Sequence, residues 1–91
     1  MLPELMSRQT KSYTFNFMPE QCRAARGLLA MDQATLAVAA SVSRNVIIDF
    51  EKGRRVPTRN NLVAIQSALE AAGVTFTNGD APGVKLKKKS K

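Results

Sequence analysis

The chain has 91 residues, of which 44% are hydrophobic and 23% charged, so it fits one small folded domain without a separate cofactor domain. It has one cysteine and no histidine, which excludes an internal disulfide, a Cys/His zinc site and the commonest general base. We therefore expect no enzymatic activity, no cofactor and no metal. The sequence shows neither a bilayer-spanning apolar run nor a secretory signal, so we expect a cytoplasmic protein with no membrane role.

The charge balance points to a polyanionic partner. Fourteen basic residues against seven acidic residues give a net charge of +7 and a pI near 10.2. Residues 74–91 hold five lysines and one aspartate, and basic tails of this kind are often only solvated. The case for nucleic acid therefore depends on the arginines in the middle of the chain.

The N-terminal segment 1–17 is expected to be an extension. Residues 1–11 show no period, whereas residues 12–17 alternate and predict a strand with Tyr13, Phe15 and Phe17 on one face. Met18 is an alternative start, which would place residues 1–17 upstream of the native chain.

Residues 18–73 carry apolar residues at helical spacing and predict four helices. Asp32, Ser43 and Thr58 are favourable N-caps for the second, third and fourth helices. The expected helices run from Pro19 to Ala30 or Met31, from Gln33 to about Ala40, from Ser43 to about Lys52, and from Thr58 to Ala72.

After Gly73 the period changes from helical to alternating. Segments 74–77 and 84–87 flank the turn-forming run Asn-Gly-Asp-Ala-Pro-Gly, which predicts a β-hairpin with a six-residue loop. Residues 88–91 form the end of a basic tail.

The second and third helices are short and are joined around Ser41, which is the helix-turn-helix plan. The stretch DQATLAVAASVSRNVIIDFEKGRRVP, residues 32–57, closely resembles the Cro/phage-repressor (XRE-like) family, and the match covers about residues 19–73. The resemblance implies sequence-specific binding to double-stranded DNA, usually as a dimer, and a role in transcription. The expected fold is mainly α, a lambda-repressor-like bundle of four or five helices with a C-terminal β-hairpin and an N-terminal strand.

In the resembling family the third helix lies in the major groove, so its outer residues are candidates for base contact. Arginine pairs bidentately with guanine and asparagine with adenine. An aspartate at this face repels phosphate, and it could accept from a cytosine amino group, limit non-specific binding or pair with a nearby arginine. The base-contact candidates are Ser43, Arg44, Asn45, Ile48 and Asp49.

A second group of residues is expected to contact phosphate. The resemblance implies that the glutamine opening the second helix bonds a phosphate and that the loop after the third helix approaches the DNA backbone. Contacts of this kind position the protein but carry no sequence information. The phosphate candidates are Gln33, Lys52, Arg54, Arg55 and Arg59.

Three other positions have structural expectations. The resemblance implies a salt bridge between Arg26 and Glu51 that joins the first and third helices. Cys22 is expected to be a small core residue, with a redox sensor as the alternative. Ser41 replaces the family's usual turn glycine, so the backbone there is expected to differ slightly.

The aromatic residues suggest how the chain assembles. A lone hairpin is marginal in water, so we expect the terminal strands to form a homodimer interface, and two-fold symmetry would let two recognition helices reach successive major grooves. The alternative is a hairpin folded onto its own helices. The interface candidates are Tyr13, Phe15, Phe17, Phe76 and Leu86.

A protein of a different function class, a protein-interaction module or antitoxin-like partner, would also use the terminal strands. The sequence leaves open the operator, the target genes, any effector, and repression versus activation.

Overall fold

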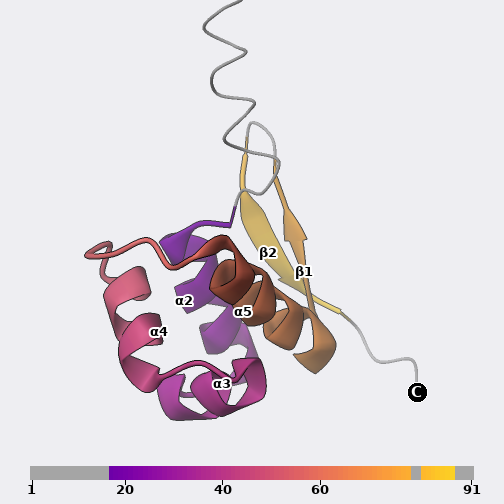
Figure 1. Cartoon of the computed structure of the whole chain (residues 1–91). Helices are drawn as coiled ribbons and strands as arrows, with labels where there is room; N and C mark the ends of the chain where they lie inside the picture. Colours follow the sequence, from indigo (N-terminus) through magenta and orange to yellow (C-terminus); the bar gives the residue numbers. More distant parts are fainter. Residues whose placement is uncertain (1–16, 79–80, 88–91) are drawn as a thin grey trace, which may run out of the picture.

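The structure, a computed structural model, describes residues 17–78 and 81–87. Within them the fold is mainly helical with a C-terminal two-stranded hairpin, as the sequence predicts (Figure 1). The elements are α2 (Pro19–Leu29), α3 (Gln33–Ala40), α4 (Arg44–Glu51), α5 (Arg59–Ala72), β1 (Val74–Thr77) and β2 (Gly83–Leu86).

Three helices begin where a short polar side chain can cap them. Asp32, Ser43 and Thr58 each accept a hydrogen bond from the backbone N–H three residues later, at 2.8, 3.2 and 3.1 Å. Each bond satisfies a donor that the first helical turn would otherwise leave free, and such caps typically contribute about 1 kcal/mol. The three predicted N-caps are therefore confirmed.

The core lies where α3 packs against both α4 and α5, with α2 behind them (Figure 1). Leu36 from α3, Ile47 from α4 and Ile65 from α5 are completely buried. These side chains hold α3 and α4 in a fixed mutual orientation, because a close-packed interior tolerates little displacement.

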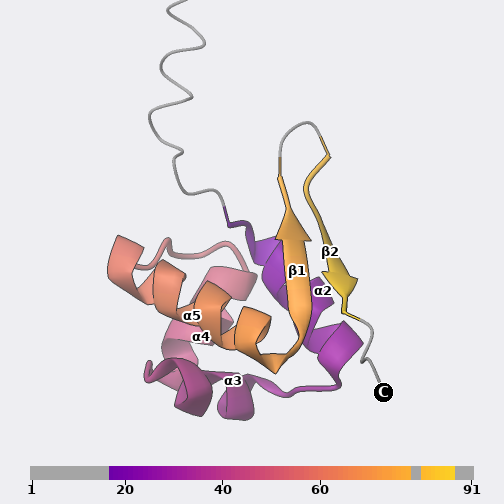
Figure 2. The ribbon, with the colours of Figure 1, turned by 90° about the vertical axis from the view of Figure 1, so that its right-hand side faces the viewer.

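The hairpin packs on its own helices rather than standing free. Its strands are antiparallel, with Val74 opposite Leu86 and Thr77 opposite Gly83, and β2 lies along α2 (Figure 2). The buried side chain of Gln21 on α2 donates to the backbone carbonyls of Thr77 and Gly83, both at 3.0 Å. These bonds fix the loop end of the hairpin to the start of α2.

Phe17 corrects one expectation for the dimer interface. Its side chain is only 7% exposed and belongs to the core, with its ring centroid 5.6 Å from that of Phe50 and 5.0 Å from that of Phe76. It precedes α2 outside any strand. A buried aromatic ring gains its stabilisation from contacts inside the chain, so Phe17 is not available to a second subunit.

The remaining interface candidates differ in exposure. Phe76 is partly buried against the core, whereas Leu86 is 52% exposed. Tyr13 and Phe15, with most of the expected strand 12–17, lie outside the described residues. In the part of the chain that the structure describes, no helix combines the length and apolarity needed to cross a membrane.

Candidate nucleic-acid interface

The turn between α3 and α4 depends on one left-handed residue. Ser41 has φ 58° and ψ 42°, and its backbone N–H donates to the carbonyl of Val38 at 3.1 Å. The next N–H, of Val42, donates to Ala37 at 3.0 Å. Serine thus adopts the left-handed conformation that glycine adopts more easily.

Helix α4 divides its side chains between the core and the surface. Ile47, Phe50 and Glu51 are buried, whereas Arg44 and Asn45 in the first turn are exposed. This division follows from the helical period, which places residues three and four apart on one face. The outward face of α4 therefore carries hydrogen-bonding groups that a partner could reach.

The other base-contact candidates lie on or beside the same helix. Ser43 is exposed, and its hydroxyl oxygen already accepts from the N–H of Val46. Ile48 and Asp49, one turn beyond the arginine and asparagine, are partly exposed. The structure therefore brings all five candidates to one helix and its N-cap.

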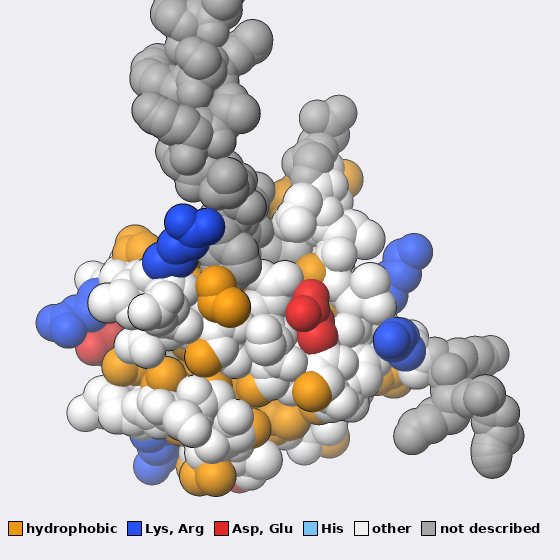
Figure 3. All heavy atoms as spheres, turned by 45° about the vertical axis from the view of Figure 1, so that its right-hand side comes forward, with side chains coloured by type: hydrophobic (Ala, Val, Ile, Leu, Met, Phe, Trp, Pro, Cys, Tyr) orange, Lys and Arg blue, Asp and Glu red, His pale blue; other side chains and the backbone are white. Residues whose placement is uncertain are grey.

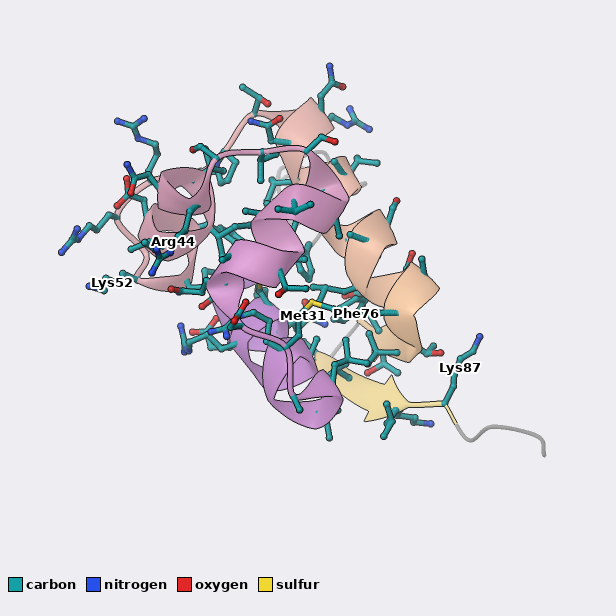
Figure 4. All side chains as sticks on the ribbon, turned by 90° about the horizontal axis from the view of Figure 1, so that it is seen from below. Met31, Arg44, Lys52, Phe76 and Lys87 are labelled. Atoms are coloured by element: carbon teal, nitrogen blue, oxygen red, sulfur yellow. The ribbon has the colours of Figure 1, made fainter. Side chains whose placement is uncertain are left out.

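The basic phosphate candidates follow α4 closely. Lys52, Arg54 and Arg55 are exposed in the segment after the helix, and Arg59 is exposed at the first residue of α5. Gly53, at φ 74°, takes up the left-handed conformation within this basic segment. Figure 4 shows Arg44 and Lys52 extending from α4 on one side of the molecule, with Lys87 beyond β2 on the opposite side.

The basic side chains around α4 and the basic side chain of Lys87 beyond β2 therefore lie on opposite sides of the molecule. In the space-filling view, basic side chains stand mostly toward the margins, and the surface between them is uncharged or apolar apart from an acidic side chain near the centre (Figure 3). The α4 end carries an ordered set of basic groups attached to a helix and a short loop. A cluster of one sign of charge on this end of the molecule can attract a polyanion.

Asp49 and Arg54 face each other across the end of α4. The Nη1 atom of Arg54 lies 3.5 Å from Oδ1 of Asp49, and both side chains keep contact with solvent. The backbone N–H of Arg54 also donates to the carbonyl of Asp49 at 2.8 Å. The acid on the outward face of α4 thus has an arginine partner within the chain.

Glu51, at the inner end of α4, is the centre of a buried polar cluster. Arg26 on α2 donates through Nε and Nη2 to the two carboxylate oxygens of Glu51, both at 2.7 Å. Gln33 donates to Oε1 and the thiol of Cys22 to Oε2, each at 3.0 Å. Arg23 donates to the backbone carbonyl of Glu51. One carboxylate therefore ties α2, α3 and α4 together.

The pKa values in this cluster follow its contacts. Burial alone would raise the pKa of Glu51, but hydrogen bonds from Arg26, Cys22 and Gln33 and the charge of Arg26 outweigh burial and lower it. The same hydrogen bond to Glu51 raises the pKa of Arg26. Burial and the neighbouring carboxylate raise the pKa of the Cys22 thiol far above its ordinary value. Cys22 is completely buried, as expected of a core residue.

The sequence analysis did not identify two residues that join the elements around the site. Arg23 binds the last carbonyl of α4, and Gln21 binds the hairpin. Gln21 also accepts from the N–H of Met18 at 3.0 Å, in the position that a capping-box glutamine occupies. That spacing was a usable signal for Gln21, whereas nothing local distinguishes Arg23 from a solvated arginine.

We also searched the described residues for a metal site. No group of three or more Cys, Asp or Glu side chains there is arranged to hold a metal ion. Gln33, at the first residue of α3, is partly exposed, so its side chain both supports Glu51 and reaches the surface beside α4.

Two short helices joined by a tight turn, with the second presenting an exposed polar face, define a DNA-binding helix-turn-helix domain. The family profile described as helix-turn-helix matches residues 23–72, more than half of the chain. The chain belongs to the Cro/phage-repressor (XRE-like) helix-turn-helix family.

A solved structure agrees with this assignment. The DNA-binding domain of the P22 C2 repressor, determined by nuclear magnetic resonance, is 34% identical, with a TM-score of 0.55. The aligned region covers 60% of this chain and 72% of that domain. A search of curated proteins finds no match.

Proposed function

We propose that this protein is a transcriptional regulator that binds operator DNA by placing α4 in the major groove. The observation that carries the proposal is the joint exposure of Arg44 and Asn45 at the first turn of α4, on a helix whose other face is buried. The first turn of a recognition helix is the part that reaches base edges. The protein would act in the cytoplasm by occupying DNA, without a cofactor.

The proposed base contacts divide by chemistry. Arg44 can donate two hydrogen bonds to guanine, and Asn45 can exchange two with adenine. Ile48 offers an apolar contact for a thymine methyl group, and Asp49 can accept from cytosine. The hydroxyl of Ser43, at the helix start, can bond to a base edge or to the backbone.

The proposed phosphate contacts surround this face. Gln33 opens α3 with its amide held by Glu51, so its position is fixed before DNA arrives. Lys52, Arg54 and Arg55 follow α4, and Arg59 opens α5. Each neutralised phosphate makes the affinity more dependent on salt.

We also propose that the protein binds DNA as a homodimer. Two recognition helices about 34 Å apart would reach successive major grooves of one duplex. Because Phe17 is buried and the hairpin rests on α2, the described residue best placed for a hairpin-mediated interface is Leu86.

In vitro selection from a random duplex library, followed by footprinting on the enriched sequence, tests operator binding. We expect one enriched site with two related half-sites, protected at nanomolar protein concentration. Replacing both Arg44 and Asn45 with alanine should abolish the enrichment, whereas Lys87→Ala, which removes a charge on the opposite side, should preserve it. Equal binding of enriched and random duplexes would contradict the proposal.

A further inference from the structure

Asp49 occupies an unusual place for an acid. It lies on the outward face of α4, one turn beyond Asn45, among groups proposed to face DNA. Of the two acidic residues on α4, Glu51 points inward and is saturated with donors. Asp49 is therefore the acid of this helix that would meet a polyanion.

Its partner, Arg54, is held close by the backbone. The Nη1–Oδ1 distance is 3.5 Å, and the main-chain bond from the Arg54 N–H to the Asp49 carbonyl is 2.8 Å. The arginine side chain is 62% exposed and the aspartate 30%. An ion pair with this much solvent contact is weak, so a better partner for either group can replace it.

The two groups have opposite preferences when DNA approaches. Arg54 gains a phosphate, whereas the Asp49 carboxylate loses its cation and is repelled by the backbone. In the major groove, the cytosine N4 amino group is a donor that a carboxylate can accept from. A cytosine that faces Asp49 would therefore donate a hydrogen bond to its carboxylate when Arg54 leaves it to bind a phosphate.

We propose that Asp49 is a specificity-determining residue that makes the phosphate contact of Arg54 depend on a cytosine at the facing position. On other sequences the ion pair persists, Arg54 stays neutralised, and binding is weaker. This inference rests on the proposed function, because it assumes that α4 faces DNA bases.

Asp49→Asn is the variant that separates this role from packing, because asparagine keeps the size of the side chain and removes its charge. We expect D49N to bind random duplex DNA about five- to ten-fold more tightly at low salt and to lose the preference for cytosine. Glu70→Gln is the matched control, since it makes the same charge change on α5, where Glu70 accepts from Gln66. We expect E70Q to change binding less than two-fold.

A double-mutant cycle with Arg54→Ala tests the coupling itself. R54A should shallow the log–log salt slope on the cytosine-containing duplex by about one, and less on the same duplex with thymine there. In the R54A background, the tightening by D49N should be smaller than in the wild type, because no arginine is left to be released and only the repulsion between the carboxylate and phosphate is removed. An equal tightening in both backgrounds would show that charge alone is responsible, and the inference would be wrong.

The measurements use equilibrium titration of the full chain against four duplexes that differ only at the facing base pair. The inference is overturned if D49N matches E70Q on random DNA or keeps the cytosine preference. If the wild-type protein binds the selected and random duplexes alike, the proposed function itself is wrong, and the inference about cytosine is wrong as well. A wild-type protein that selects an operator with no dependence on Asp49 overturns only the inference.

Discussion

Arg26 on α2 contacts both carboxylate oxygens of Glu51 at the end of α4, with two donor–acceptor distances of 2.7 Å. The glutamate side chain is 3% exposed and the arginine 20%. Arg26 also donates to the carbonyl of Met31, which fixes its guanidinium from a second direction. Because this pair joins two helices in a buried setting, its loss affects the position of α4 as well as the stability of the chain.

Glu51→Ala should lower the free energy of unfolding by roughly 3–5 kcal/mol, because it leaves Arg26 largely buried and unpaired. Chemical denaturation followed by circular dichroism measures this loss. Glu70→Ala, at an exposed acid on α5, should stay within about 0.5 kcal/mol of the wild type. A loss below about 1 kcal/mol for E51A would show that the pair contributes little.

Stability should fall in acid partly through Glu51. Its pKa is below the ordinary 4.5 in the folded protein, so the unfolded chain binds this proton more readily. The stabilisation is therefore complete above about pH 4.5 and is lost as the pH falls through the lower folded pKa.

Denaturation curves between pH 2 and pH 7 for wild type and Glu51→Gln test this dependence. The variant should be less stable at neutral pH and should lose less stability in acid. Asp32, whose pKa is lowered by its capping bonds to Thr35, should leave a residual acid dependence in both proteins. Parallel curves for the two proteins would contradict the assignment to Glu51.

Phe17→Ala should cost roughly 3–5 kcal/mol of stability, because it empties a buried site between two other aromatic rings. Leu86→Ala, at a half-exposed position, should cost much less in the isolated chain. Thermal denaturation at low protein concentration compares the two. If Phe17→Ala behaves like a surface substitution, the ring is not part of the core.

Arg44→Ala and Asn45→Ala should each weaken binding to the selected operator by roughly 1–3 kcal/mol and leave binding to random DNA nearly unchanged. The reason is that base contacts add affinity only where the correct base is present. Fluorescence anisotropy on both duplexes measures the difference. Equal losses on the two would assign these side chains to phosphate contact instead.

Leu86→Glu should shift the protein from dimer to monomer if the hairpin supports the proposed interface, since it places a charge in an apolar contact. Sedimentation at tens of micromolar distinguishes the two states. Lys85→Gln on the same strand makes the same one-unit change in net charge and controls for it. A point substitution is preferable to removing the hairpin, which would delete the core residue Val74 and leave the buried amide of Gln21 without its carbonyl partners. An unchanged dimer, or a monomeric wild type, would remove Leu86 from the interface.

Local chemistry was sufficient for much of the fold. Asp32, Ser43 and Thr58 cap helices through contacts spanning three residues, so their roles can be inferred from short segments. The hairpin was predicted for the same reason, with β2 beginning one residue earlier than expected. The exposed face of α4 can also be inferred from the helical spacing of its apolar residues, because these residues mark the buried face and the opposite face is exposed.

Tertiary structure decided what those elements contact. The alternation that includes Phe17 is equally consistent with a strand face and with a single ring entering the core, and only the packed helices select the second. Gln21 and Arg23 find partners that are 56 and 28 residues away. In the free chain the segment after α4 places Arg54 beside Asp49, which is one of the alternatives that the sequence leaves open. The sequence determined the helices, caps and hairpin because those interactions are local, whereas long-range partners depend on how the helices pack in space.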